Sequence, residues 1–351
     1  MQLQQRIKAF VQLGKVLKAI GSRGPWPGFE IGVGQTEYES LERQVQQAQI
    51  HNKWFTEENV RKAMKAWGEQ LTAENLEKWL EDYSTDFEQP IDKTVGIVMA
   101  GNIPLVGFHD LLTVLISGAK AKVKMSSDDT VLMQQVIETV ILIEPDFKDR
   151  VELAPDRLKG IDAVMATGSN NTARYFEYYF SEMPNIIRKN RNSVAVLTGD
   201  ESAEELHQLG TDIFAYYGLG CRNVSKIYLP ESYDLDAFFK GIFEYKDVID
   251  HNKYGNNYDY NKTIWLMNKE TIYDNGFLLL KEEKSLSSPL ATVYYERYND
   301  IDDVKTELEN RSEELQCVVG KDFLPFGEAQ QPALWDYADG VNTLDFMKSL
   351  R

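Results

Sequence analysis

The sequence predicts an α/β protein in which a doubly wound parallel sheet of nucleotide-binding type is joined to a second, smaller α/β domain. Short, β-branched apolar runs such as TVGIVMA (94–100) and SVAVLTG (193–199) are typical of buried parallel strands. Helical segments alternate with these runs, which is the pattern of strands connected by crossover helices. Apolar residues at three- and four-residue spacing before residue 85 add a helical N-terminal region.

The N-terminal region is predicted to be helical over 1–20 and over much of 38–85. Thr72 is an expected N-cap, because an acidic residue, Glu74, stands in the first turn after it. Glycines and prolines between residues 21 and 34 separate the first helix from the second.

The elements after Pro90 follow from apolar runs and helical periodicity. Strands are predicted at 94–100, 118–125, 151–156, 163–169, 193–199, 225–230, 261–268, 289–298 and 316–320, and helices at 108–117, 130–144, 171–180, 202–219, 234–249 and 301–314. The predicted domains are a helical region (1–90), a nucleotide-binding domain (91–199), a smaller domain (200–322) and a C-terminal segment (323–351).

Composition and charge restrict the function classes. The chain has 351 residues, with 38 Lys and Arg against 55 Asp and Glu, and a net charge of −17. This acidic balance opposes general binding to nucleic acid. Neither a signal peptide nor a membrane span is recognised, so the chain is expected to be cytoplasmic, with its two cysteines reduced. Its four histidines show no metal-ligand spacing, and no metal site is expected.

Three segments in order carry the chemical signal: MAGNIPLVGFHDLLTVLISGAKAKVKMSS (99–127), MATGSNNTARYF (165–176) and YYGLGCRNVSKIYLP (216–230). They resemble the aldehyde dehydrogenase superfamily, and within it the acyl-CoA reductases of the luciferase-operon type. PALWDYADGVNTLDFM (332–347) also resembles the ending of bacterial members of that family. The resemblance covers about 90–350 and implies an aldehyde dehydrogenase-like fold, with the active site in the crevice between two domains.

The resemblance assigns the nucleophile to Cys221 and an oxyanion-binding amide to Asn102. An isolated cysteine is more often a small buried hydrophobe, but the preceding Gly-Leu-Gly favours a loop that presents a side chain to a ligand. Arg222 either favours the thiolate or is a solvated surface charge. Cys317, within an apolar run, is expected in the core. The alternative for Asn102 is an ordinary turn residue.

The resemblance assigns cofactor contacts to Lys124, Ser126, Ser127, Gly168 and Ser169. Ser127 stands where the family carries a glutamate that binds the ribose 2′-hydroxyl. Loss of that carboxylate favours NADPH, with NADH as the alternative. Lys124 as a solvated strand-end cation, and Thr-Gly-Ser as an ordinary turn and N-cap, are the competing interpretations.

Two departures from the superfamily pattern bear on the reaction. Ile187 lies near the place of the glutamate that activates the deacylating water, so hydrolysis of an acyl-cysteine should be slow. The later Glu-x-Phe-Gly-Pro motif of the superfamily keeps its proline here, as Pro289, but not its glutamate. The resemblance therefore supplies no carboxylate to bind the nicotinamide ribose. RKNRN (188–192) is either a solvated loop or a local phosphate site.

These observations predict NADPH-dependent reduction of an acyl-CoA to an aldehyde through an acyl-cysteine. A semialdehyde or acyl-phosphate reductase, and a catalytically silent cofactor-binding scaffold, are the alternatives. The acyl chain length is not readable from the sequence, because no aromatic or methionine stripe separates a tunnel from core. Base rates favour a homodimer.

Overall fold

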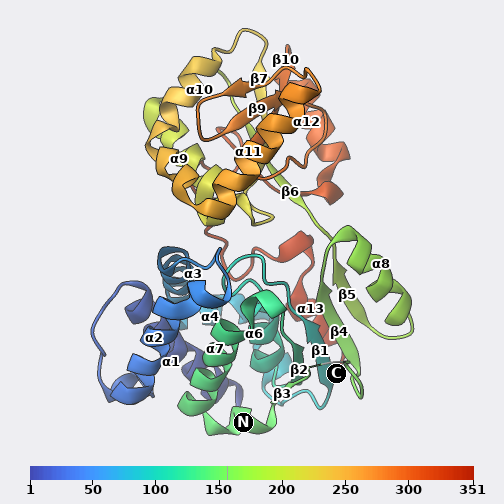
Figure 1. Cartoon of the computed structure of the whole chain (residues 1–351). Coiled ribbons are helices and arrows are strands. Elements are labelled where there is room, and N and C mark those ends of the chain that lie inside the picture. The colour runs from blue at the N-terminus through green and yellow to red at the C-terminus, as the bar shows by residue number, and fades with distance from the viewer. Residues whose placement is uncertain (156) are drawn as a thin grey trace. The chain divides into compact units, whose positions relative to one another are not determined.

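The structure, a computed structural model, describes residues 1–155 and 157–351 and contains two compact units (Figure 1). Unit 1 comprises Met1–Lys189 and Ala333–Arg351, and unit 2 comprises Asn190–Pro332. The division falls at 189/190 rather than at the expected 199/200, because the strand at Asn192–Val196 hydrogen-bonds within the sheet of unit 2. Residues 333–351 return to unit 1, so the chain passes between the units twice.

Unit 1 contains a fully parallel five-stranded sheet with the order β3-β2-β1-β4-β5. The order reverses between β1 and β4, which is the switch point of a doubly wound sheet. Its strands are β1 (Thr94–Val98), β2 (Lys120–Lys124), β3 (Val151–Leu153), β4 (Ala163–Thr167) and β5 (Asn185–Arg188). Asp156, the last residue of the strand expected at 151–156, lies outside the described residues.

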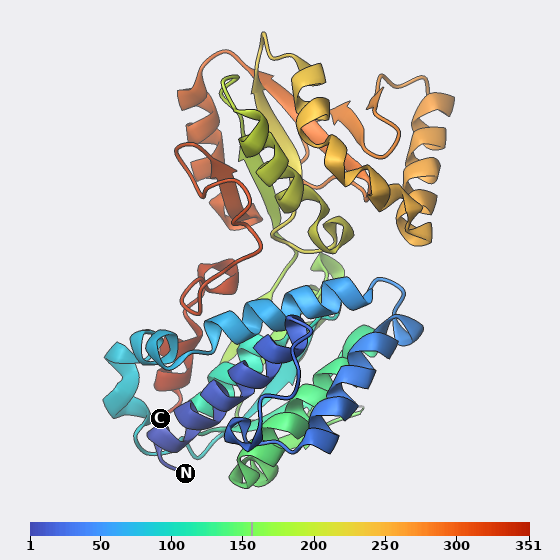
Figure 2. The ribbon, with the colours of Figure 1, turned by 90° about the vertical axis from the view of Figure 1, so that its left-hand side faces the viewer.

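The helices of unit 1 cover this sheet and form the N-terminal region. They are α1 (Leu3–Gly21), α2 (Gln35–His51), α3 (Glu57–Gln70), α4 (Ala73–Trp79), α5 (Ser84–Phe87), α6 (Phe108–Ile116), α7 (Thr130–Ile143), α8 (Asn170–Tyr179) and α13 (Thr343–Ser349). Helix α6 packs on β1 and β2, and α8 packs on β4 and β5. Helix α1 lies against α3 and α7, as Figure 2 shows, so the N-terminal helices extend the core of the sheet domain.

The C-terminal segment completes the core of unit 1. Leu344 and Met347 of α13 are fully buried, and α13 packs on α6. Trp79 donates a hydrogen bond from Nε1 to the hydroxyl of Tyr337 at 2.9 Å. His109 contacts the carbonyl oxygen of Leu334 through Nε2 at 2.9 Å, and burial lowers the pKa of this histidine.

Unit 2 is built around a six-stranded sheet with the order β11-β6-β7-β10-β9-β8, parallel except for the β8–β9 pair. The strands are β6 (Asn192–Val196), β7 (Val224–Pro230), β8 (Tyr273–Asp274), β9 (Leu279–Glu282), β10 (Thr292–Tyr298) and β11 (Leu315–Gly320). The helices are α9 (Ala203–Phe214), α10 (Leu235–Gly241), α11 (Asn252–Met267) and α12 (Ile301–Asn310). A short 3₁₀ helix at Ala215–Gly218 follows α9 and leads into β7.

Two sequence predictions are corrected by the structure. The strand expected at 261–268 is the second half of α11, because its consecutive apolar residues belong to a helix that buries Tyr258, Asn261 and Trp265 at helical spacing. Strands β5, β8 and β9 were not predicted. Each has at most four residues, too few to show a clear alternation of apolar side chains.

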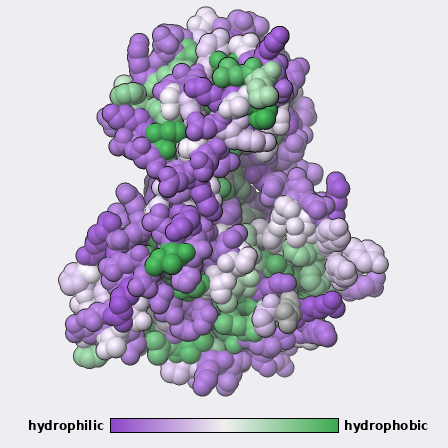
Figure 3. Space-filling view, in the orientation of Figure 1, coloured by the Kyte–Doolittle hydropathy of each residue, from purple (hydrophilic) through white to green (hydrophobic). Residues whose placement is uncertain are grey.

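The viewed surface is mostly hydrophilic, and its hydrophobic residues form small separate groups (Figure 3). Among the described residues, no helix is both long enough and apolar enough to cross a bilayer.

Candidate functional site

Three parallel strands of unit 1 bring most of the predicted site residues to one edge of the sheet. Asn102 follows β1, Ser126 and Ser127 follow β2, and Gly168 follows β4. The carboxyl ends of neighbouring parallel strands meet at the same edge, beside the switch point, where ligands bind in sheets of this kind. Gly101 is packed so closely that a Cβ there would lie 2.6 Å from Cβ of Ser126, so the β1 turn and the β2 turn touch.

The Asn102 turn is held by a buried carboxyl group. Leu105, in the left-handed region at φ 59°, donates its backbone N–H to Oδ2 of Asp129 at 2.8 Å. Burial raises the pKa of Asp129 to about 7, although hydrogen bonds from the Leu105 and Met133 N–H groups oppose that shift. Left-handed backbone costs about 1–2 kcal/mol for a non-glycine residue, so Asp129 maintains a turn that the chain would otherwise relax. Asn102 itself is exposed.

Some of the residues predicted to contact the cofactor are exposed, and others accept hydrogen bonds at the start of a helix. Lys124 is exposed at the end of β2, and Ser127 and its neighbour Asp128 are exposed directly after it. The hydroxyl of Ser126 accepts the N–H of Asp128 at 3.3 Å. Ser169, next to Gly168, is the N-cap of α8 and accepts the N–H of Thr172 at 3.2 Å. Both serines thus have a structural role, and Lys124 offers a cation at this edge.

Cys221 lies in unit 2 and is exposed in the loop between α9 and β7. The chain enters this loop through three consecutive left-handed residues, Tyr216 (φ 50°), Tyr217 (φ 60°) and Gly218 (φ 80°). Two of the three are not glycine, and such strain is found preferentially at functional sites. The sequence indicated a turn from its glycines, but not the strain at the two tyrosines.

Asn223 anchors the Cys221 loop. Its Nδ2 donates to the carbonyl oxygens of Asp212 at 2.9 Å, Ile213 at 3.3 Å and Ala215 at 2.9 Å, and its Oδ1 accepts the N–H of Gly220 at 2.8 Å. One buried amide therefore bonds to the free carbonyl groups at the carboxyl end of α9. The same amide holds the backbone of the loop at the residue before the cysteine. Sequence reasoning missed Asn223, although an asparagine two positions after a candidate nucleophile was visible.

Ser193 on β6 links the two cysteines. Its Oγ donates to the carbonyl oxygen of Cys221 at 2.9 Å and lies 3.1 Å from Sγ of Cys317. Because the serine has one hydrogen, the Cys317 thiol is the donor in the second contact. Burial raises the pKa of Cys317, which keeps it protonated. Cys317 is only partly buried, rather than in the core as expected.

Arg222 supports the segment after β11. Its Nε donates to the carbonyl oxygen of Ala329 at 2.6 Å, while the buried carboxylate of Asp212 accepts the N–H groups of Gly327 at 2.7 Å and Ala329 at 3.0 Å. The positive charge of Arg222 also lowers the pKa of Cys317 against the larger effect of burial. This side chain is therefore bonded to the protein rather than a solvated charge.

The cations of RKNRN (188–192) are bonded within the protein. Arg188 is buried and forms an ion pair with Asp110 at 2.5 Å. Lys189 pairs with Glu177 at 2.7 Å, and Arg191 donates to the carbonyl oxygen of Leu315 at 3.0 Å. Ile187 lies on β5, paired with Ala166 of β4, so a partly buried alkyl side chain lies near the position where the resemblance places the hydrolytic glutamate.

Three of the four histidines have local roles in the structure. His251 is the N-cap of α11 and stacks on Tyr217, His207 packs on Tyr245, and His109 contacts Leu334 as described above. Within residues 1–155 and 157–351, no group of three or more His, Cys, Asp or Glu side chains is arranged to hold a metal ion.

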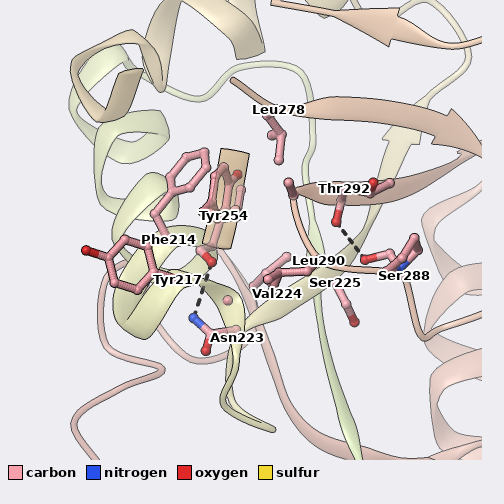
Figure 4. A pocket seen from close by; sticks show the side chains of 14 residues that line it. Phe214, Tyr217, Asn223, Val224, Ser225, Tyr254, Leu278, Ser288, Leu290 and Thr292 are labelled. Atoms are coloured by element: carbon pink, nitrogen blue, oxygen red, sulfur yellow. Dashed lines mark hydrogen bonds between the residues drawn. The ribbon is translucent and has the colours of Figure 1, made fainter. Parts of the chain in front are cut away.

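A pocket of about 90 Å³, open on one side, lies in unit 2 beside the Cys221 loop (Figure 4). It is lined by Gly218 and Asn223 of that loop, by Phe214 of α9 and Tyr254 of α11, and by Leu278 and Leu290. These residues come from separate elements that only the fold assembles. Pro289, which the resemblance aligns with the proline of the Glu-x-Phe-Gly-Pro motif, is also in the wall.

No protein-family model and no curated protein sequence matches the chain. Its fold is similar to solved aldehyde dehydrogenases. The NAD⁺ complex of an aldehyde dehydrogenase from Bacillus cereus matches with a TM-score of 0.59 and 12% identity, over 91% of this chain and 72% of that chain. An NAD-dependent benzaldehyde dehydrogenase from Corynebacterium glutamicum matches with 0.65 and 11%, over 91% and 76%. The putative aldehyde dehydrogenase PutA from Anabaena variabilis matches with 0.53 and 13%, over 97% and 91%. The chain therefore has an aldehyde dehydrogenase-like fold.

Proposed function

We propose that the chain is an acyl-CoA reductase that uses NADPH to convert a thioester to an aldehyde through an acyl-cysteine. One observation carries the proposal: Cys221 is exposed in a strained and firmly anchored loop on an aldehyde dehydrogenase-like fold. A scaffold that had lost its chemistry would have no use for this strain. The neighbours named above act on aldehydes, which supports aldehyde oxidoreductase chemistry in general.

In the first step, the Cys221 thiolate adds to the carbonyl carbon of the thioester. The carbon–sulfur bond to coenzyme A then breaks, and coenzyme A leaves as a thiolate that takes up a proton. The side-chain amide of Asn102 and the backbone N–H of Cys221 donate hydrogen bonds to the negative oxygen of the intermediate. Each such donor contributes about 3 kcal/mol to the transition state.

The edge of the unit 1 sheet fits a nicotinamide nucleotide, because it combines the switch point, the cation of Lys124 and the capped N-terminus of α8 after Ser169. NADPH, when bound, supplies the hydride that reduces the acyl group. The carbon on Sγ of Cys221 then carries a negatively charged oxygen. This oxygen re-forms the carbonyl group as the carbon–sulfur bond breaks, which releases the aldehyde and restores the Cys221 thiolate.

Ile187 favours reduction over oxidation to an acid. A carboxylate at this position would activate water against the acyl-cysteine, whereas the alkyl side chain of Ile187 cannot accept a proton. The acyl-cysteine then persists until a thiol or a hydride reaches it. This argument separates acyl-CoA reduction from aldehyde oxidation to a free acid, and it applies equally to acyl-phosphate substrates.

The experiment is the intact mass of the protein after mixing with acyl-CoA thioesters in the absence of nucleotide. We expect an acyl adduct that is lost in Cys221→Ala, is retained in Cys317→Ala and disappears on addition of NADPH. Because the chain has two cysteines, Cys317→Ala is the matched control. An adduct that survives Cys221→Ala, or none from any thioester, would overturn the proposal, and an adduct from acyl phosphates alone would reassign the substrate.

A further inference from the structure

We propose that the outer face of α11 is a dimer interface, on which a second copy of this chain packs its own α11 in the antiparallel direction. The face is formed by Tyr260, Ile264 and Met267 and is named the α11 stripe. The proposal goes beyond the chemistry of Cys221 and does not depend on it. It is carried by the exposure of the α11 stripe, by the sequence of the helix and by the charges that flank the stripe.

The last turn of α11 is apolar around its whole circumference. Its residues Ile264, Trp265, Leu266 and Met267 are consecutive, and successive side chains of a helix point about 100° apart. Trp265 is buried at 8% exposure, whereas Ile264, Leu266 and Met267 are 38%, 56% and 75% exposed. A helix that is apolar on every side is normally covered on every side. One chain covers only the Trp265 side, so the other side calls for a partner.

The inner face of α11 is already bonded within unit 2, and this fixes which face points outward. The hydroxyl of Tyr258 donates to Oδ1 of Asp274 at 2.6 Å, and Nδ2 of Asn261 donates to the carbonyl oxygen of Leu290 at 2.8 Å. The residues of the α11 stripe are spaced by four and three positions, so they share a second face of the helix. Helix α11 crosses the front of unit 2 in Figure 1, where that face is accessible.

The α11 stripe is complementary to itself in an antiparallel pair. A two-fold axis beside Ile264 places Tyr260 against the partner's Met267, and symmetry repeats this contact at the other end. An aromatic ring and a thioether sulfur attract each other, so the two ends match. Ile264 then lies close to the axis, where it meets the partner's Ile264 in an apolar contact.

An acidic and a basic side chain flank the α11 stripe with the symmetry that this pairing needs. Asp259 precedes Tyr260, Lys269 follows Met267 by two positions, and both charged side chains are exposed. In the part of the chain that the structure describes, neither Asp259 nor Lys269 forms an ion pair. Antiparallel packing brings Asp259 beside the partner's Lys269 at both ends, whereas parallel packing would place like charges together. This charge complementarity identifies a second copy of the chain as the occupant.

The test is sedimentation velocity of the full chain over a range of about 1 to 200 µM. A single helix pair is a small interface, so we expect a reversible dimer that forms at tens of micromolar, roughly. Ile264→Asp places two carboxylates near the axis and should weaken dimerisation at least about a hundredfold. Leu142→Asp, at an exposed position near the end of α7, is the matched control and should leave it unchanged. A monomer at every concentration, or a dimer that survives in a folded Ile264→Asp variant, would overturn the proposal.

A charge exchange tests the antiparallel arrangement without touching the apolar contacts. Asp259→Lys alone should weaken the dimer about tenfold, because both symmetric pairs become like-charged. Asp259→Lys combined with Lys269→Asp should return the dissociation constant to within about twofold of the wild type. Both positions are exposed, so the melting temperatures should stay close to that of the wild type. A double variant as weak as Asp259→Lys alone would overturn the proposed pairing.

Discussion

The two loops that carry the proposed chemistry are strained alike but anchored differently. In unit 1, the turn of Asn102 contains the left-handed Leu105 and is held by the carboxyl group of Asp129. In unit 2, the loop of Cys221 begins with two left-handed tyrosines and is held by the amide of Asn223. Both anchors are buried.

The difference lies in what each anchor does when the pH changes. The amide of Asn223 does not titrate, so the Cys221 loop keeps its four hydrogen bonds at any pH that the fold survives. Asp129 has a pKa raised to about 7 by burial, so its charge changes near neutrality. The hydrogen bonds of the Cys221 loop are thus independent of pH, whereas the Asn102 turn is held by a group that gains and loses a proton.

The largest effect is expected from Asn223→Asp. The substitution keeps the acceptor for Gly220 but removes the Nδ2 donor from three carbonyl groups and places a carboxylate against them. We expect a loss of about 3 kcal/mol or more in the free energy of unfolding, measured by urea denaturation, and loss of acylation. Asn256→Asp, at an exposed position on α11, is the control. If the Asn223→Asp variant were as stable as the wild type, Asn223 would not be the residue that holds the Cys221 loop.

Asn102→Ala tests the chemistry assigned to the unit 1 turn. The side chain is exposed, so its loss should leave the melting temperature close to that of the wild type. If its amide stabilises the oxyanion, the acylation rate should fall by about 10²- to 10³-fold, measured by rapid-quench intact mass. A fall of less than about threefold would leave Asn102 as an ordinary turn residue.

Asp129→Asn tests the pH dependence directly. The pKa of Asp129 is raised from 3.8 to about 7 on folding, so its stabilising contribution is complete below about pH 4 and is lost as the pH rises through about 7. The wild-type free energy of unfolding should therefore fall across this window by more than about 1.4 kcal/mol relative to the variant. Denaturation at several pH values measures the difference, and parallel curves would contradict it.

The smallest effect is expected from Ser193→Ala, which removes the hydrogen bond to the Cys221 carbonyl oxygen and the acceptor of the Cys317 thiol and N–H. The Cys221 carbonyl belongs to an exposed loop and can bond to water instead, whereas the Cys317 N–H loses its acceptor, so we expect a loss of about 2 kcal/mol and a few-fold slower acylation. Ser287→Ala, at an exposed position in the same unit, should change neither value. A loss as large as that in Asn223→Asp would show that Ser193 shares the anchoring equally.

Much of the fold was predictable because buried parallel strands with five or more apolar or β-branched residues leave a clear trace, as at 94–100 and 193–199. The failures have a common physical origin. Strand β9 has four residues, of which two are leucine, and Ile264 to Met267 form an apolar run that suits a strand as well as a helix. Only the tertiary contacts of Tyr258 and Trp265 decide in favour of the helix.

The residues of the candidate site were predictable where they follow strands, since the order of segments places Asn102, Lys124 and Gly168 at one sheet edge. The residues that hold these loops in place, Asp129 and Asn223, were not predictable. They act through hydrogen bonds with backbone groups, and such bonds leave no pattern in the sequence. The pocket was also invisible, since Phe214, Tyr254 and Leu290 approach one another only in the folded unit.

The return of residues 333–351 to unit 1 has a consequence for the order in which the nascent chain folds. Unit 2 is one continuous stretch, so all of it has been synthesised before the segment that carries Thr343 and Leu344 is made. Until then, Thr113 of α6 lacks the Thr343 hydroxyl that lies 3.1 Å from its own, and the surface that α13 buries stays open. The first domain to begin folding is thus the last to finish, and during that interval its exposed apolar surface is a natural target for a chaperone.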